Sequence, residues 1–449
     1  MKKLILGFSM LALLASCNGG GRGELIGVSP RSDFYQVNPY GMNYIPPGSF
    51  SMGPSDQDVP YANNAKTKTV SVQAFYMDDT EISNNEYRQF VYWVKDSIAH
   101  TILGDADIGE HLITEDAYGE DLDPPLINWD ERIEWDGEEE REELADMFLS
   151  EGERFYGRKN IDTRKLKYTY FWIDLKAAAS KSGRDLDLSY ENSKGQTNAI
   201  RGHVDRSKYI IREEINVYPD TLVWISDFTY SFNEPMTESY FWHPAFDDYP
   251  LVGVTWAQAK AFNIWRTQLM NNYLKSSGQD MVQRFRLPSE AEWEYASRGG
   301  LESNPYPWGG PYTRNIFGCP LANFKPMRGD YIEDGGFHTV EINSYEPNDF
   351  GLYCMSGNVA EWTNTAYDES VYDFSHDLNP EYTYDALKND PPALKRKVTR
   401  GGSWKDVKYY IQTGTRTYEY RDTAKSYIGF RSVMSYLGRG KTGNSEDWN

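Results

Sequence analysis

Three helix-start signatures constrain the fold of this chain more than any other feature. Residues 83–86, 255–258 and 289–292 each place a Ser or Thr three positions before a Glu or Gln. In such a capping box the hydroxyl accepts the amide hydrogen three residues on, while the Glu or Gln side chain bonds back to the first amide. Apolar residues follow each signature at helical spacing, as with Tyr87 and Phe90. The sequence therefore predicts three amphipathic helices that share a core.

Strand signals flank these helices. Residues 42–53 contain two β-favouring runs around Pro46 and Pro47, which predicts a strand, a turn and a second strand. Apolar and polar residues alternate in part over 70–76, a pattern typical of a half-buried strand. From about residue 240 the chain is rich in Gly, Trp, Tyr and Asn and has few long periodic segments. We expect an α+β fold that is poor in regular secondary structure.

The N-terminus has the features of an export signal. Lys2 and Lys3 precede an apolar run from Leu4 to Leu14, which is too short to span a bilayer but suits a signal peptide. Residues 14–17 then match the lipobox of bacterial lipoproteins. We expect removal of the signal peptide 1–16 and acylation of Cys17, whose several acyl chains anchor firmly where one chain is marginal. The alternative is an ordinary signal peptide with a chance cysteine.

The expected location follows from the residues after the lipid site. No acidic pair comes directly behind Cys17, so the sequence carries no surface-export tag of that kind. We therefore expect a lipid anchor in the outer membrane, with the protein on the periplasmic face.

The net charge of the chain argues against nucleic acid as a partner, and many of the acidic residues lie in one segment. Lys and Arg number 46 against 67 Asp and Glu, so the formal net charge is -21, which argues against a broad nucleic-acid-binding surface. Residues 101–153 hold 20 of the acidic residues and only two arginines, Arg132 and Arg141. Two interpretations stay open, a solvated insertion and a docking face for a basic partner.

Several blocks resemble the formylglycine-generating enzyme (sulfatase-modifying factor) family. They occur in family order at residues 45–53, 76–84, 250–256, 286–296, 306–309, 348–362, 400–404 and 429–431. The resemblance implies the α+β, C-type-lectin-like fold of that family. On this basis the chain divides into a lipid-anchored leader at 17–40, the family domain at 41–98 and 240–436, an insertion at 99–239 and a C-terminal tail at 437–449.

The same resemblance implies a lost metal site. Family enzymes bind copper through two cysteines after the block at 400–404 and oxidise a substrate cysteine to formylglycine. Asp406 and Ile411 fall at these positions, and an isoleucine cannot supply the thiolate that Cu(I) prefers. We therefore expect no copper, no other catalytic cofactor and no enzymatic activity. The alternative is an oxidase of this type with a rearranged site.

The sequence offers few other side chains that could bind a metal ion. None of the six histidines forms a close ligand pair in the sequence, and Cys319 and Cys354 lie in other blocks, where a disulfide between them is not deducible.

A structural calcium site is a further implication of the family. Gly357, Val359 and Glu361 match one calcium-binding block, although Cys354 alters its first position, and Asn323 and Asp334 match a second loop more weakly. Carbonyl and carboxylate oxygens suit a hard cation. The other interpretation is that Glu361 caps a turn or pairs with an arginine.

A lipobox, missing copper thiols and a long insertion together resemble one branch of the family, the PorK/GldK-type lipoproteins of type IX secretion and gliding motility. The resemblance implies a structural lipoprotein that builds a large ring with a PorN/GldN-type periplasmic partner. A GldJ-like gliding lipoprotein is the nearest alternative. A lectin-like glycan binder, suggested by 34 Tyr and 13 Trp, is another.

Overall fold

The computed structural model describes most of the chain after residue 35. The described residues are 36–54, 66–116, 118–154, 157–179, 189–191, 197–199, 207–230, 235–325, 332–333, 335–387 and 389–438. The predicted signal peptide and Cys17 lie outside them. Residues 39–436 form one compact unit, and in a second unit the side chain of Gln36 accepts a hydrogen bond from the amide of Leu437 at 2.8 Å.

The three predicted helices are confirmed, each with both halves of its capping box. Helix α2 (Asn84–Asp105) begins after Ser83, α6 (Trp256–Ser276) after Thr255 and α7 (Glu290–Arg298) after Ser289. Because the capping hydrogen bonds join residues three apart, they depend little on the rest of the fold. Helix α7 ends at Gly299, whose φ of 58° lies in the left-handed region that glycine tolerates best.

Two four-stranded sheets form the framework of the family domain. The first has the order β1-β4-β16-β11 and the second the order β14-β13-β12-β15. In the second sheet β12 and β15 run parallel, and every other neighbouring pair in the two sheets is antiparallel. The bounds are β1 (Met42–Ile45), β4 (Phe75–Asp78), β16 (Val433–Ser435), β11 (Phe285–Arg286), β14 (Thr417–Tyr420), β13 (Arg396–Arg400), β12 (Ala360–Ala366) and β15 (Ile428–Gly429).

The alternating pattern at 70–76 is interrupted in the structure. Strand β3 (Lys68–Val72) pairs with β2 (Gly48–Met52), whereas β4 crosses into the first sheet. The break falls at Gln73, whose amide donates to the Asn379 side chain at 2.8 Å. All four residues of β4 are buried, because this strand lies between two others. The single strand expected at 70–76 was therefore wrong, whereas the strands expected within 42–53 are present as β1 and β2.

The largest core cluster is aromatic and lies between α2 and α6. The rings of Phe90 and Trp265 are 5.1 Å apart, and those of Tyr87 and Phe262 are stacked at 5.5 Å. Tyr168, from the ribbon made by β7 (Lys167–Ile173) and β10 (Ile210–Asn216), packs edge-on against Phe90 at 5.2 Å. Part of the segment predicted as an insertion therefore contributes to the main core.

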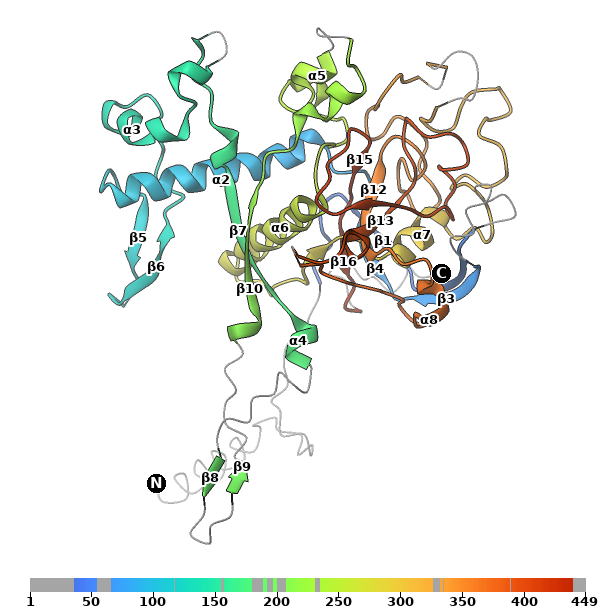
Figure 1. Cartoon of the computed structure of the whole chain (residues 1–449), viewed down its shortest axis with the longest axis horizontal. Coiled ribbons are helices and arrows are strands. Elements are labelled where there is room, and N and C mark those ends of the chain that lie inside the picture. The colour runs from blue at the N-terminus through green and yellow to red at the C-terminus, as the bar shows by residue number, and fades with distance from the viewer. Residues whose placement is uncertain are drawn as a thin grey trace, which may run out of the picture. The chain divides into compact units, whose positions relative to one another are not determined.

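Another part of the insertion packs on the far end of α2 (Figure 1). Helix α2 runs seven residues beyond the expected boundary at 98, and Leu103 packs there with Leu144 and Met147. Hairpin β5 (Leu112–Glu115) and β6 (Asp121–Ile127), helix α3 (Glu138–Glu143) and η1 (Leu144–Met147) build this region, which we call the acidic lobe (residues 106–153). No residue of α3 is buried.

Short elements complete the described chain. They are η2 (Glu151–Glu153), η4 (Thr163–Lys165), α4 (Leu175–Ala179), β8 (Ser189–Glu191), β9 (Thr197–Ala199), η6 (Ser207–Tyr209), η7 (Thr221–Ser226), α5 (Pro235–Ser239), η8 (Pro244–Phe246), α8 (Val371–Phe374) and η9 (Pro392–Lys395). Within the described ranges no helix is both long and apolar enough to cross a bilayer. The fold is α+β with modest regular secondary structure, as expected.

Candidate functional site

The site expected to have lost copper lies in the loop that follows β13. Gly401 and Gly402 turn the chain there with φ of 90° and 66°. A Cβ on Gly402 would lie 2.6 Å from the carbonyl oxygen of Tyr410, so only glycine lets the two ends of this loop approach. The loop therefore brings position 411 back beside the start of the turn.

Asp406 closes this loop by hydrogen bonding. Its carboxylate accepts the Ser403 amide at 2.9 Å and the Ser403 hydroxyl at 2.6 Å. Its carbonyl oxygen accepts the amide of Lys325 at 2.8 Å. Burial raises the pKa of the Asp406 carboxyl, and the two Ser403 hydrogen bonds lower it in part. Asp406 thus has a structural role at a position where the family resemblance leads us to expect a thiol.

Ile411 is part of a small hydrophobic core. Its side chain is fully buried against Tyr306, Ala322 and Phe324. Its carbonyl oxygen accepts the Ser356 hydroxyl at 2.8 Å. A carboxylate engaged with serine and an aliphatic side chain in a core do not fit a thiolate-bound copper ion.

The two cysteines of the family domain lie elsewhere in the sequence than positions 406 and 411. Cys319 is exposed and Cys354 is buried, and both are free thiols. Burial, together with the nearby Glu81 carboxylate, raises the pKa of the Cys354 thiol, which disfavours the thiolate. Among the described residues no group of three or more His, Cys, Asp or Glu side chains has metal-binding geometry.

The candidate calcium residues are brought close together, apart from Asp334, which lies outside the described residues. The Asn323 carbonyl accepts the Asn358 amide at 2.9 Å, and a Cβ on Gly357 would lie 2.2 Å from the same oxygen. Val359 is buried next to them and donates its amide to Glu81 at 3.2 Å.

Glu361 already has a cationic partner. Arg431 approaches both of its carboxylate oxygens, with contacts of 2.7 to 2.9 Å, and Trp293 donates its indole hydrogen to the same carboxylate at 2.7 Å. This geometry agrees with the second interpretation of Glu361, the arginine pair. The carboxylate at this position fits a permanent guanidinium partner better than calcium.

Glu81 is a buried carboxylate that sequence reasoning did not identify. It accepts hydrogen bonds from the Asn358 side chain at 2.6 Å and from the Val359 amide. Burial raises its pKa well above the usual range, and the Glu361 charge raises it further. Arg431, the ion-pair partner of Glu361, also lowers the pKa of Glu81, so one arginine interacts with two buried carboxylates.

A second buried charge cluster surrounds Trp256. The ammonium of Lys397 lies 3.9 Å from the centre of its indole ring and donates to the Asn364 carbonyl at 3.1 Å. Burial lowers the pKa of Lys397 to about 7, and Lys260, also over this ring, has a lowered pKa for the same reason. Neither lysine belongs to a recognisable motif, so this cluster could not be predicted from the sequence.

A histidine pair was also missed. His100 and His111 place their Nδ1 atoms 2.9 Å apart, and each side chain is only 3 % exposed. Trp129 packs against His100 at 5.4 Å between ring centres. The two histidines are eleven positions apart in the sequence and meet because the chain turns back between α2 and β5.

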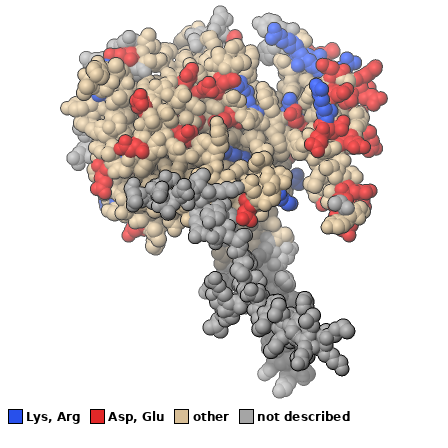
Figure 2. Space-filling view, turned by 180° about the vertical axis from the view of Figure 1, so that it is seen from behind, with Lys and Arg blue, Asp and Glu red and all other residues tan. Residues whose placement is uncertain are grey.

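The acidic lobe is folded and strongly charged. Figure 2 shows Asp and Glu side chains gathered over the part of the molecule that carries β5, β6 and α3. All six residues of α3 are Glu or Arg, and none is buried. Both interpretations of this segment, solvated surface and docking face, agree with a helix whose charges all face water.

Comparisons with known proteins agree with this description. The model of the "Sulfatase-modifying factor enzyme 1-like domain" family matches residues 32–436. The formylglycine-generating enzyme of Bos taurus is 24% identical over 405 residues, which are 88% of this chain and 74% of that protein. The inactive C-alpha-formylglycine-generating enzyme 2 of Bos taurus is 32% identical over 191 residues, which are 41% of this chain and 50% of that protein.

Among solved structures, PvdO from Pseudomonas aeruginosa superposes with a TM-score of 0.45 at 16% identity, covering 91% of this chain and all of that one. CarF superposes with a TM-score of 0.39 at 16% identity, covering 89% of this chain and 99% of that one.

Proposed function

The chain belongs to the family of the sulfatase-modifying factor enzyme 1-like domain, and from this membership we propose that it is a non-enzymatic, structural member. One observation carries the proposal. Asp406 bonds to Ser403 and Ile411 fills a core at the two positions where the family resemblance places copper thiols. Without two thiolates the loop cannot hold Cu(I) in the manner of the family enzymes.

The relatives support a loss of activity within this fold. Proteins named inactive C-alpha-formylglycine-generating enzyme 2, from cattle and mouse, are 32% and 31% identical to this chain over about two fifths of its length. The family fold therefore occurs in proteins named as inactive. The match to the cattle formylglycine-generating enzyme over 88% of this chain favours one competing function, a formylglycine-type oxidase with a rearranged site.

A finer proposal concerns the cellular role. We propose a PorK/GldK-type lipoprotein, anchored in the outer membrane through acylated Cys17 and facing the periplasm. There it forms a large ring with a PorN/GldN-type partner in type IX secretion and gliding motility. The lipobox, the missing thiols and the acidic insertion support this role, and a GldJ-like lipoprotein is the alternative within the same class. The acidic lobe is a natural face for a basic partner, since opposite charge speeds encounter.

The test is the native mass of the protein extracted from its own membranes in mild detergent. The proposal expects a particle many times heavier than the 51.7 kDa chain that contains a second periplasmic protein. A Cys17→Ser variant is the matched control, because it removes the anchor and leaves the folded domain intact. Crosslinking in intact cells that yields only monomer would contradict the proposal.

A further inference from the structure

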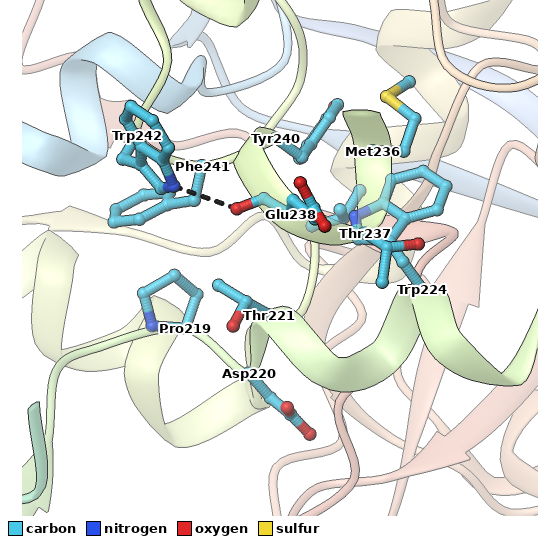
Figure 3. Close-up of a pocket in the computed structure, with 11 residues that line it drawn as sticks. Pro219, Asp220, Thr221, Trp224, Met236, Thr237, Glu238, Tyr240, Phe241 and Trp242 are labelled. Carbon is cyan, nitrogen blue, oxygen red and sulfur yellow. Dashed lines mark hydrogen bonds between the residues drawn. The ribbon is translucent and has the colours of Figure 1, made fainter. Parts of the chain in front are cut away.

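A small pocket lies between η7 and α5, where the insertion meets the family domain, and its lining residue Trp224 stacks on Trp404 of the loop of Asp406 with ring centres 5.9 Å apart. Figure 3 shows Pro219, Asp220 and Thr221 on one side of it and Phe241, Trp242 and Glu238 on the other. The cavity has a volume of about 10 Å³, which is room for one water-sized group. Beneath it Trp224 and Tyr240 pack with Val252 and Val359 of the family domain, so the floor of the pocket is rigid.

The walls of the pocket combine aromatic faces with carboxylates. Trp242 is held in place because its indole nitrogen donates to the Glu238 carbonyl at 2.9 Å. Asp220 caps η7 by accepting the Leu222 amide at 2.9 Å. The exposed Glu238 carboxylate makes no hydrogen bond or ion pair with any part of the chain that the structure describes. The residues that line the pocket thus include an unpaired carboxylate and an exposed indole ring.

Size and charge select the ligand chemistry. A cation over an aromatic face is attracted by the ring quadrupole, and a carboxylate at the rim adds to the attraction. An ammonium group is about the size of the water that the cavity can hold, whereas a planar guanidinium with its five donors is larger. A lysine ammonium therefore fits the pocket better than an arginine.

The surroundings indicate that the ammonium arrives on a protein. Leu222 and Ile225 are exposed on η7, Tyr230 is 96 % exposed just beyond it, and Trp242 is 54 % exposed at the rim. Exposed aromatic and aliphatic side chains around a small pocket are typical of protein–protein contacts. The formal net charge of -21 favours a partner with basic residues.

We propose that the pocket between η7 and α5 is a docking site for a lysine side chain of a basic partner protein. The partner's apolar surface covers Leu222, Ile225 and Trp242, and its ammonium lies between the Trp242 ring and the Glu238 carboxylate. The pocket needs neither a membrane anchor nor a ring, so its test stands apart from the proposed cellular role.

The test is a titration of the full chain, labelled with ¹⁵N at the tryptophan indoles, with N-acetyl-lysine N-methylamide. The Trp242 resonance is assigned from a Trp242→Phe variant. We expect a saturable shift of this resonance in the millimolar range, and at least fivefold weaker binding of the norleucine and arginine analogues.

Two variants locate the interaction. Glu238→Gln removes the free carboxylate without changing the size of the side chain, and we expect it to weaken lysine binding at least threefold. Glu302→Gln, an exposed acid outside the pocket, should leave binding unchanged. Absence of a saturable shift, equal binding of norleucine, or full affinity in the folded Glu238→Gln variant would overturn the proposal.

Discussion

The Asp406 carboxylate accepts both the amide and the hydroxyl hydrogen of Ser403, at 2.9 and 2.6 Å. Two short bonds to a residue three positions away lock the turn after β13. The side chain of a copper ligand at position 406 would have to face the metal ion, so it could not make these hydrogen bonds to Ser403. The Ser403–Asp406 pair therefore gives position 406 a structural role.

The first prediction tests this structural role with two substitutions. Asp406→Ala leaves the Ser403 amide and hydroxyl without their acceptor, so we expect a loss of about 1–3 kcal/mol in the free energy of unfolding. Asp406→Asn keeps an acceptor and removes a charge whose burial raises the carboxyl pKa. We expect its stability near neutral pH to equal or exceed that of the wild type. Urea unfolding measures both, and equal losses in the two variants would contradict the assignment.

The second prediction concerns the buried pair of Arg431 and Glu361. Arg431→Met leaves Glu361 without its cation and Glu81 without its nearest positive charge, and we expect a loss of about 3–5 kcal/mol. Adding Glu361→Gln should recover part of this loss, because a neutral amide can still accept the Trp293 indole hydrogen. Chemical denaturation of both variants checks the coupling, and strictly additive losses would argue against an ion pair.

The third prediction follows from Lys397. Burial lowers its pKa to about 7, whereas the ordinary value is 10.5. Between these values the unfolded chain binds the extra proton, so stability should rise with pH from 7 toward 10.5, by about 1.4 kcal/mol per pH unit from this group. Lys397→Met should remove this slope, and Lys275→Met, at an exposed lysine of α6, should keep it. Denaturation midpoints measured at several pH values test this prediction. An unchanged slope of stability against pH in Lys397→Met would refute the lowered pKa of Lys397.

The fourth prediction concerns His100 and His111. Burial and the facing His111 ring lower the pKa of His100 below its ordinary 6.5, while Asp96 and Glu131 act in the opposite direction. The unfolded chain therefore binds more protons at acid pH, and the stabilising contribution of neutral His100 should be lost as pH falls below 6.5.

Hydrogen exchange in β5 and β6 at pH 5.5 and 7.5 measures this loss, because His111 directly precedes β5. Because the intrinsic exchange rate itself falls with pH, the comparison uses protection factors, and we expect lower protection at pH 5.5 than at pH 7.5 in the wild type and a smaller pH effect in His111→Asn. His376→Asn, at an exposed histidine, is the control and should behave as the wild type. Equal pH effects in His111→Asn and the wild type would contradict the prediction.

Local signals predicted the parts of the fold that depend on near neighbours. The capping boxes at Ser83, Thr255 and Ser289 join residues three apart, so the sequence placed all three helix starts correctly. The strand expected at 70–76 failed because the chain changes sheets at Gln73. That change depends on partners far along the sequence, such as Asn379.

The contacts of the candidate site could not be predicted from the sequence. The assignment of Asp406 and Ile411 to the copper positions follows from the family resemblance behind the block at 400–404 and stays a prediction. The pairing of Glu361 with Arg431, of Glu81 with Asn358, and of His100 with His111 depends on how the chain returns on itself. Neither the periodicity nor the spacing of residues in the sequence indicates which distant segments come into contact. These pairs could therefore be identified only in the structure.

The most direct measurement of the central claim is copper content together with product formation. Purified protein is loaded with Cu(I), passed through a desalting column and analysed for metal. It is then incubated aerobically with a cysteine-containing sulfatase peptide, and the peptide mass is measured. The account predicts less than a tenth of a copper ion per chain and an unmodified cysteine. One copper per chain together with a formylglycine peptide would contradict it.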